Sequence, residues 1–115
     1  MRHVLALSIT LSLLVACGGG HHAAASAKVF KYRGSQQCTG GGASIAELQQ
    51  QLSNAGIAVS ASSCGTDGNF RAAVCGGPDG AIAIFDIPAN QVERASSLSF
   101  LPLSKLPAAR EMPCK

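Results

Sequence analysis

Five cysteines in a chain of 115 residues are the feature that most constrains what this sequence can fold into. Four of them follow residue 27, namely Cys38, Cys64, Cys75 and Cys114. An even number suits pairing into two disulfides, which persist in oxidising compartments and stabilise domains with a limited apolar core. The fifth, Cys17, stands apart, and its surroundings decide whether the chain reaches such a compartment.

The first residues have the pattern of an export signal. A basic start precedes the uncharged run VLALSITLSLLV. A helix that crosses a bilayer needs about 20 apolar residues, whereas this shorter run suits the apolar part of a cleaved leader. The run ends in Leu14-Val15-Ala16-Cys17, which resembles the lipobox of bacterial lipoproteins. The resemblance implies that residues 1–16 are a signal peptide, removed just before the cysteine.

Membrane attachment follows from this resemblance. In the lipoprotein class the cysteine thiol carries a diacylglycerol and the new amino terminus is usually acylated, for instance with palmitate, so Cys17 is the expected lipid attachment site. Two or three acyl chains on one residue hold a protein on a bilayer. In this class, an aspartate directly after the acylated cysteine resembles the signal for retention in the inner membrane. This chain has Gly18 at that position, so we expect it in the outer membrane of a cell with two membranes. An ordinary cleaved signal with a stray cysteine and an uncleaved anchor remain as alternatives.

The chain then divides into a tether and one domain. Residues 17–27 are small and rich in glycine and alanine apart from His21 and His22, which is typical of a flexible spacer. Two adjacent histidines on such a spacer offer too few ligands for a structural zinc, so we expect neither a metal site nor a cofactor. Residues 28–115 are long enough for a single small domain.

The charge pattern argues against nucleic acid as a partner. Nine Lys and Arg stand against six Asp and Glu, and only Lys28, Lys31 and Arg33 form a cluster. Proteins that bind nucleic acids need a denser stripe of basic residues than this one. Those that bind single strands also need aromatic side chains on which the bases stack, and aromatic residues make up only 4% of this chain. These three side chains are better explained as the solvated face of a strand.

Hydrophobic patterning predicts alternating strands and helices. Ser44 to Glu47 match the capping box of a helix that ends near Gly56. The β-branched run at 81–87 predicts a central strand. The other expected elements are strands at 29–33, 57–61 and 99–103, a short strand at 71–75, and a helix after Pro88 that reaches Leu98.

Without the extra short strand, the element order is β-α-β-β-α-β, the split pattern of ferredoxin-like folds. We therefore expect an α+β domain built as a small, disulfide-stapled two-layer sandwich. In it, the apolar stripes of both helices pack against Val59, Ile82 and Ile84 on one face of an antiparallel sheet.

The strand ends of such a sheet bring three of the four domain cysteines close together. The simplest pairing is Cys64 with Cys75 and Cys38 with Cys114. Three connectivities are possible, and the sequence alone does not choose between them.

No residue of the domain is predicted to be catalytic. Histidine is absent after residue 27, which removes a Ser-His or Cys-His pair from the domain. Asp67 and Asp79 lie in turns, where aspartate stabilises the backbone geometry.

The domain resembles the small cysteine-stapled lipoproteins of bacterial envelopes that lack an assigned activity. We therefore expect a lipid-anchored envelope protein whose domain binds another envelope protein or supports structure. One alternative is a thiol-disulfide redox protein that uses Cys64 and Cys75. Another is an inhibitor of a secreted hydrolase, with an exposed loop such as Ser62–Phe70.

Overall fold

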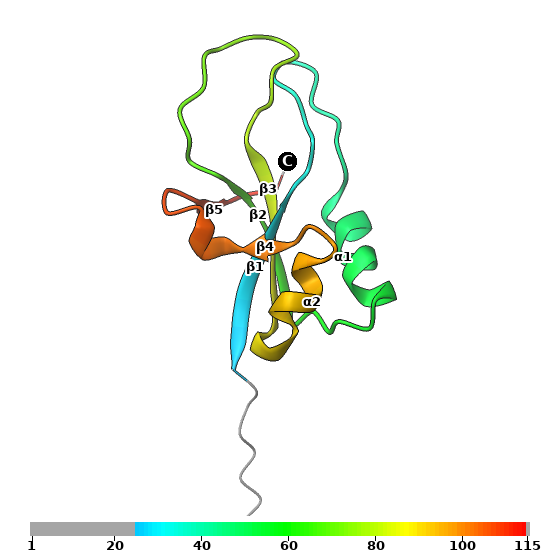
Figure 1. The fold of residues 1–115 in the computed structure, drawn as a ribbon. Helices are drawn as coiled ribbons and strands as arrows, with labels where there is room; N and C mark the ends of the chain where they lie inside the picture. Colours follow the sequence, from blue (N-terminus) through cyan, green and yellow to red (C-terminus); the bar gives the residue numbers. More distant parts are fainter. Residues whose placement is uncertain (1–24, 115) are drawn as a thin grey trace, which may run out of the picture.

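The structure, a computed structural model, describes residues 25–114. The predicted signal peptide, Cys17, Gly18 and the histidine pair of the tether lie outside the described residues. The fold is a five-stranded antiparallel sheet with two α-helices, in the order β4-β1-β3-β2-β5 (Figure 1). The elements are β1 (Ser26–Tyr32), α1 (Ile45–Asn54), β2 (Ala61–Thr66), β3 (Ala81–Pro88), η1 (Ala89–Gln91), α2 (Val92–Ser96), β4 (Leu101–Pro102), η2 (Leu103–Lys105) and β5 (Arg110–Met112).

Local signals explain where α1 begins and ends. The Ser44 hydroxyl accepts a hydrogen bond from the Glu47 N–H at 3.0 Å, and the Glu47 carboxylate accepts from the Ser44 N–H at 2.7 Å. The predicted capping box is therefore confirmed. Gly56 follows the helix with a φ of +76°, the left-handed conformation that ends helices at glycine.

The central strand β3 confirms the strand predicted at 81–87 and separates two apolar clusters. The larger cluster lies on the face covered by both helices, where Ala83, Phe85 and Ile87 belong to the same buried cluster as Leu48 and Leu52 of α1. The Phe85 and Phe100 rings meet edge to face with centroids 5.8 Å apart. This face holds the main core.

The prediction that Ile82 and Ile84 pack against the helices is wrong. Both side chains point to the opposite face of the sheet, because side chains alternate along a strand and the helix side takes the odd-numbered residues of β3. There they join Phe30 and are covered by Leu103 and Leu106 from the segment after β4. This segment covers a sheet face that a two-layer arrangement leaves open.

Two predicted strands are also corrected. The strand expected at 57–61 begins only at Ala61, since Ile57 packs into the main core as the chain leaves α1. Residues 71–75 form no strand, because the backbone at Ala72 and Val74 bonds to a side chain of another loop. The additional strand is instead β5, which pairs with the edge of β2.

The disulfides confirm that all four domain cysteines are paired, but with different partners from the simplest pairing. Cys38 is bonded to Cys75, and Cys64 to Cys114. The cause is β5: it places Met112 opposite Cys64, so that Cys114 arrives beside that residue. The Cα atoms of the two pairs are 5.1 and 5.2 Å apart, within the usual span of a disulfide.

Candidate functional site

Two long loops form the end of the domain opposite the start of β1 (Figure 1). We call residues 34–43 and 67–80 together the loop end. Gln37 connects them: its side-chain amide donates to the carbonyls of Ala72 and Pro78, each at 3.1 Å, and accepts from the Val74 N–H at 3.0 Å. One side chain of the first loop therefore fixes three backbone positions of the second.

The Cys38–Cys75 disulfide strengthens the same connection. It lies next to Gln37, whose backbone N–H donates to the Gly77 carbonyl at 2.8 Å and whose carbonyl accepts from the Gly76 N–H at 3.0 Å. Both cysteines are exposed, so this bond lies at the surface. The two loops therefore behave as one cross-linked unit.

A buried carboxylate holds the base of the second loop. Asp67 is fully buried and accepts two hydrogen bonds from the Arg71 guanidinium, at 2.8 and 2.6 Å, and one from the Tyr32 hydroxyl at 2.9 Å. Its Oδ1 also accepts from the Asn69 N–H at 3.0 Å. Burial of a charge is tolerated when it is paired and its oxygens are satisfied, as here.

The pKa values of this cluster follow from those contacts. The hydrogen bonds from Arg71 hold the pKa of the Asp67 carboxyl well below its usual range and outweigh desolvation, which acts in the opposite sense. The pKa of Arg71 is raised by the same hydrogen bonds. Burial, and then the bond to Asp67, raise the pKa of Tyr32. Asp67 and Arg71 therefore remain an ion pair at any physiological pH.

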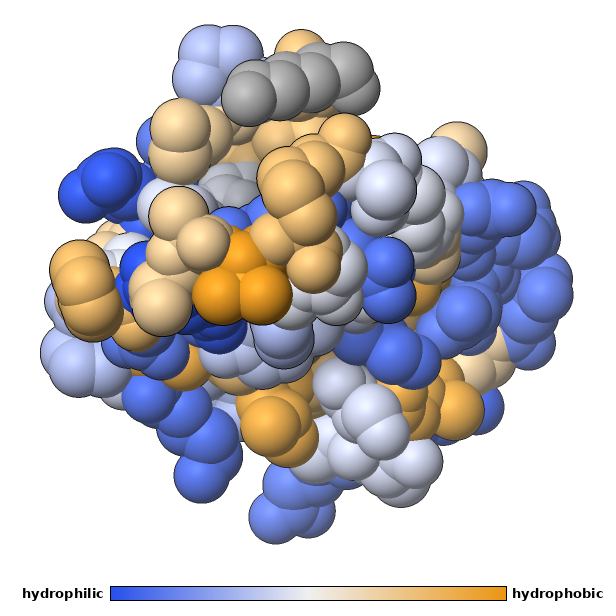
Figure 2. Space-filling model, turned by 90° about the horizontal axis from the view of Figure 1, so that it is seen from above, coloured by the Kyte–Doolittle hydropathy of each residue, from blue (hydrophilic) through white to orange (hydrophobic). Residues whose placement is uncertain are grey.

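The second loop presents apolar side chains to solvent. Phe70 is 97% exposed and Val74 is 58% exposed. The chain from Asn69 to Val74 forms no helix, strand, turn or bend, so the backbone that carries these side chains makes no sharp change of direction there. Figure 2 views the molecule from above, onto the loop end, and shows apolar residues among polar ones near the centre of this face.

The loop end is also poor in free charge. Its charged residues are Asp67 and Arg71, which are bound to each other, and Asp79, whose carboxylate accepts hydrogen bonds from Ser35 and Ala81. Protein–protein interfaces are depleted in charged residues and enriched in aromatic ones at their centres. An exposed phenylalanine in such surroundings is typical of a binding surface.

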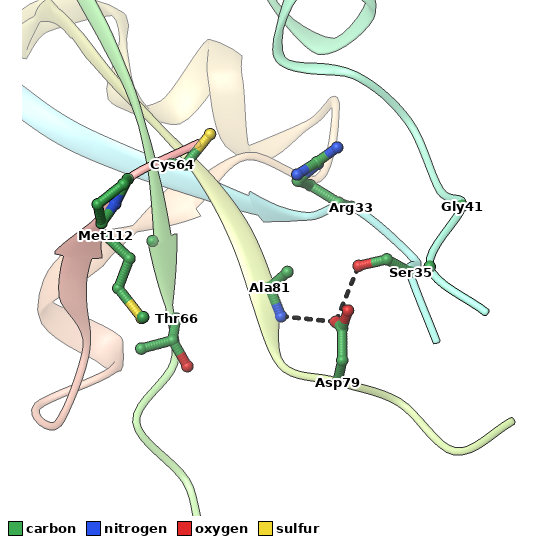
Figure 3. Close-up of a pocket in the computed structure, with 11 residues that line it drawn as sticks. Arg33, Ser35, Gly41, Cys64, Thr66, Asp79, Ala81 and Met112 are labelled. Carbon is green, nitrogen blue, oxygen red and sulfur yellow. Dashed lines mark hydrogen bonds between the residues drawn. The ribbon is translucent and has the colours of Figure 1, made fainter. Parts of the chain in front are cut away.

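A pocket of about 380 Å³ lies beside the loop end (Figure 3). Arg33, Ser35 and Asp79 line one side, and Thr66 and Met112 the other. This volume falls at the lower end of small-molecule sites, which span about 300–1,000 Å³.

The polar side chains of this pocket already have partners within the chain. Asp79 accepts from the Ser35 hydroxyl at 2.8 Å and from the Ala81 N–H at 2.9 Å, and Arg33 donates to the Ala43 carbonyl at 2.8 Å. Partial burial acts to raise the pKa of the Asp79 carboxyl. The hydrogen bonds that the carboxylate accepts outweigh this effect, so the pKa is lowered. The pocket residues therefore hold the loops in place, and Asp79 has the turn role predicted for it.

The structure separates the two cysteines proposed for redox chemistry. Cys64 is 6% exposed and bonded to Cys114, whereas Cys75 lies at the surface of the loop end with Cys38. The exposed loop predicted at Ser62–Phe70 is also shifted, since Ser62 belongs to β2 and Asp67 is buried, while the exposed residues are 69, 70 and 72–76.

Sequence reasoning missed Gln37 and the ion pair of Asp67 with Arg71. A signal existed for the ion pair: an acid and a base four residues apart in a stretch otherwise without charge. For Gln37 there was none, because its partners are backbone atoms more than 30 positions away.

Within residues 25–114 no three His, Cys, Asp or Glu side chains are grouped so as to hold a metal ion. Over the same range, neither α1 nor α2 has the length and apolar content to cross a bilayer. Comparisons with protein-family models, curated proteins and solved structures found no match to this chain.

Proposed function

We propose that this chain is a lipid-anchored protein of the bacterial envelope whose domain binds a protein partner through the loop end. The lipobox-like sequence that ends at Cys17 supports the anchor, and Gly18 supports the outer membrane where there are two. Pairing of all four domain cysteines supports export, because disulfides persist outside the reducing cytosol.

The position of the loop end suits this arrangement. The chain that leads from Cys17 enters the domain at Ser26, the first residue of β1, at the end of the domain opposite the loop end (Figure 1). A lipid anchor at Cys17 would therefore leave Phe70 directed away from the membrane, toward partners in the envelope.

We further assign the domain to the ferredoxin-like class with β5 added at one edge. The element order β1-α1-β2-β3-α2-β4 and the antiparallel strand order β4-β1-β3-β2 support this assignment. The class by itself implies no activity, because unrelated functions share such folds.

The observation that carries the binding function is the 97% exposure of Phe70 on a segment fixed by an ion pair, a disulfide and the Gln37 amide. Exposed aromatic residues on rigid segments bind with little loss of conformational entropy and often dominate the affinity of an interface. The alternative of a thiol-disulfide redox protein assumed a disulfide between Cys64 and Cys75. In this structure the exposed Cys38–Cys75 disulfide would have to serve as the redox-active bond instead.

Photo-crosslinking in intact envelopes tests this function. A photoreactive amino acid at position 70 should yield a discrete crosslinked protein, and the same group at Leu101, an exposed aliphatic residue of β4, should not. Recovery of the same product from both positions, or from neither, would contradict binding through the loop end.

A further inference from the structure

The residues on either side of Phe70 are held by the same carboxylate. Asp67 accepts from the backbone N–H of Asn69, at 3.0 Å, and from its side-chain amide at 3.3 Å, immediately before Phe70. It binds the guanidinium of Arg71 immediately after it. The Phe70–Arg71 peptide bond thus lies between two residues that are tied independently to one buried group.

The segment beyond Arg71 is fixed as well. The Gln37 side chain holds the Ala72 carbonyl and the Val74 N–H, and the Cys38–Cys75 disulfide follows one residue later. The scaffold therefore restrains the backbone on both sides of Phe70, while the aromatic ring itself projects into solvent.

We propose that residues 67–74 form an inhibitory loop that occupies the active site of a serine endopeptidase, with Phe70 in its primary specificity pocket. The proposal rests on binding through the loop end and names the class of partner. Two observations select this class. The chain from Asn69 to Val74 forms no helix, turn or bend, so it can lie along a substrate cleft as a peptide does, and one exposed aromatic side chain matches a pocket that takes one apolar side chain.

The contacts of Asp67 explain why the partner would be inhibited. The serine hydroxyl oxygen of the peptidase attacks the carbonyl carbon of Phe70, and the bond to the Arg71 nitrogen breaks. The serine proton passes through the peptidase histidine to the new Arg71 amine, which gives an ester on the serine and a free amino terminus.

In an ordinary substrate this amine diffuses away and water then hydrolyses the ester. In this loop the Arg71 amine stays beside the ester, because Asn69 and Arg71 remain bound to Asp67. Held at high effective concentration, the amine attacks the ester, re-forms the Phe70–Arg71 bond and returns the proton to the serine. The peptidase thus remains occupied by an essentially intact loop.

Inhibition assays with the acylated full chain in detergent test this proposal. We expect stoichiometric inhibition of chymotrypsin, whose pocket accepts aromatic side chains, and little inhibition of trypsin. Phe70→Gly should weaken the inhibition of chymotrypsin by about 100-fold or more, the effect of a lost central aromatic contact. Phe70→Lys should transfer inhibition from chymotrypsin to trypsin, whereas the matched control Leu101→Lys should leave the wild-type pattern unchanged.

A second variant tests resealing separately from binding. Asp67→Asn removes the charge that holds Arg71, so the loop should still enter the chymotrypsin pocket but be cut between Phe70 and Arg71 with loss of inhibition over time. Mass spectrometry of the reaction measures the cut, and circular dichroism verifies that the variant is folded.

Each outcome decides between the two proposals. Rapid complete cleavage of the wild-type loop by chymotrypsin, or no effect of the protein on either peptidase, would overturn the inhibitory loop. If position 70 still crosslinks to an envelope protein in that case, binding through the loop end stands. If no crosslink forms either, both proposals fail.

Discussion

At the scale of single residues, Asp67 shows how much one carboxylate can organise. It completes the turn expected for it, since it accepts from the Asn69 N–H two positions ahead. It also accepts hydrogen bonds from Arg71 and from the Tyr32 hydroxyl, which belong to a loop and a strand that the sequence does not place together. Its burial depends on these partners, because an unpaired charge at the same position would be strongly destabilising.

Replacement of Asp67 by Asn should therefore lower stability in a pH-dependent way. The pKa of Asp67 is lowered in the folded state, so its stabilising effect is complete above the unfolded pKa, about 4, and is lost as pH falls toward the folded pKa. We expect Asp67→Asn to reduce the free energy of unfolding by about 2–3 kcal/mol at pH 7. Urea titrations of both proteins should show a constant difference down to about pH 5 and a shrinking one below pH 4. A difference that grows on acidification would contradict this assignment.

Gly68 illustrates a second constraint at residue scale, the close approach of two backbones. Its φ is +74°, and a Cβ atom there would collide with the carbonyl of Ala108 in the segment that covers the second face of the sheet. Gly76 has a similar φ of +88° but open space around it. Substitutions at Gly68 and Gly76 therefore distinguish the free-energy cost of a positive φ from the additional cost of a steric collision.

We expect Gly68→Ala to lower the free energy of unfolding by about 3 kcal/mol or more, because the covering segment must move. Gly76→Ala should cost only about 1–2 kcal/mol, the conformational part alone. Chemical denaturation of the two variants measures both. Equal losses of unfolding free energy in the two variants would show that the backbone at Ala108 can move away from the new Cβ atom without a free-energy cost.

At the scale of elements, the sequence predicts best what is decided locally. The capping box at Ser44 and Glu47 and the β-branched run of β3 were found because their signals lie within a few residues of each other. The pairing of β5 with β2 depends on residues more than 40 positions apart, and β5 is a short exposed strand without an apolar pattern. The disulfide partners could not be predicted because they depend on that pairing.

The candidate site was predictable only in part, for the same reason. An exposed loop and two turn aspartates were expected, but the position of Phe70 follows from Gln37, Asp67 and Arg71, which meet only in the folded domain. Helix and strand periodicity contain no information about such loop-to-loop contacts.

The two disulfides should differ in their reactivity. Both cysteines of Cys38–Cys75 lie at the surface of the loop end, whereas in the other bond Cys64 is 6% exposed within β2, next to β5, and only Cys114 is exposed. Access of a thiolate governs the rate of exchange. Under mild reduction followed by alkylation, mass mapping should find label on Cys38 and Cys75 before Cys64 and Cys114. Label appearing first on Cys64 would indicate that β5 opens more readily than the loop end.

Loss of either bond should be costly. With sequence separations of 37 and 50 residues, each contributes about 4 kcal/mol in the chain-entropy account of cross-links.

At the scale of the whole molecule, the domain has two functionally distinct ends. The chain enters at Ser26, and the loop end, whose second loop carries the exposed Phe70, lies opposite (Figure 1).

Removal of the proposed acylation site tests the anchor directly. Cys17→Ala should shift the protein from the membrane fraction to the soluble envelope fraction and abolish metabolic labelling with palmitate. Detergent phase partitioning of the two proteins provides the measurement, and Leu101→Lys, which retains Cys17 and all four cysteines of the domain, is the control. Unchanged partitioning of Cys17→Ala would contradict lipid attachment.

The connectivity of the two disulfides has a consequence for how the domain withstands cleavage of its backbone. Along the chain the two bridges interleave, since Cys64 lies inside the span of Cys38–Cys75 and Cys75 lies inside that of Cys64–Cys114. Any single break of the backbone between residues 38 and 114 therefore falls within at least one closed ring. A molecule nicked once in this region stays one covalent particle and sheds no fragment until a second break occurs.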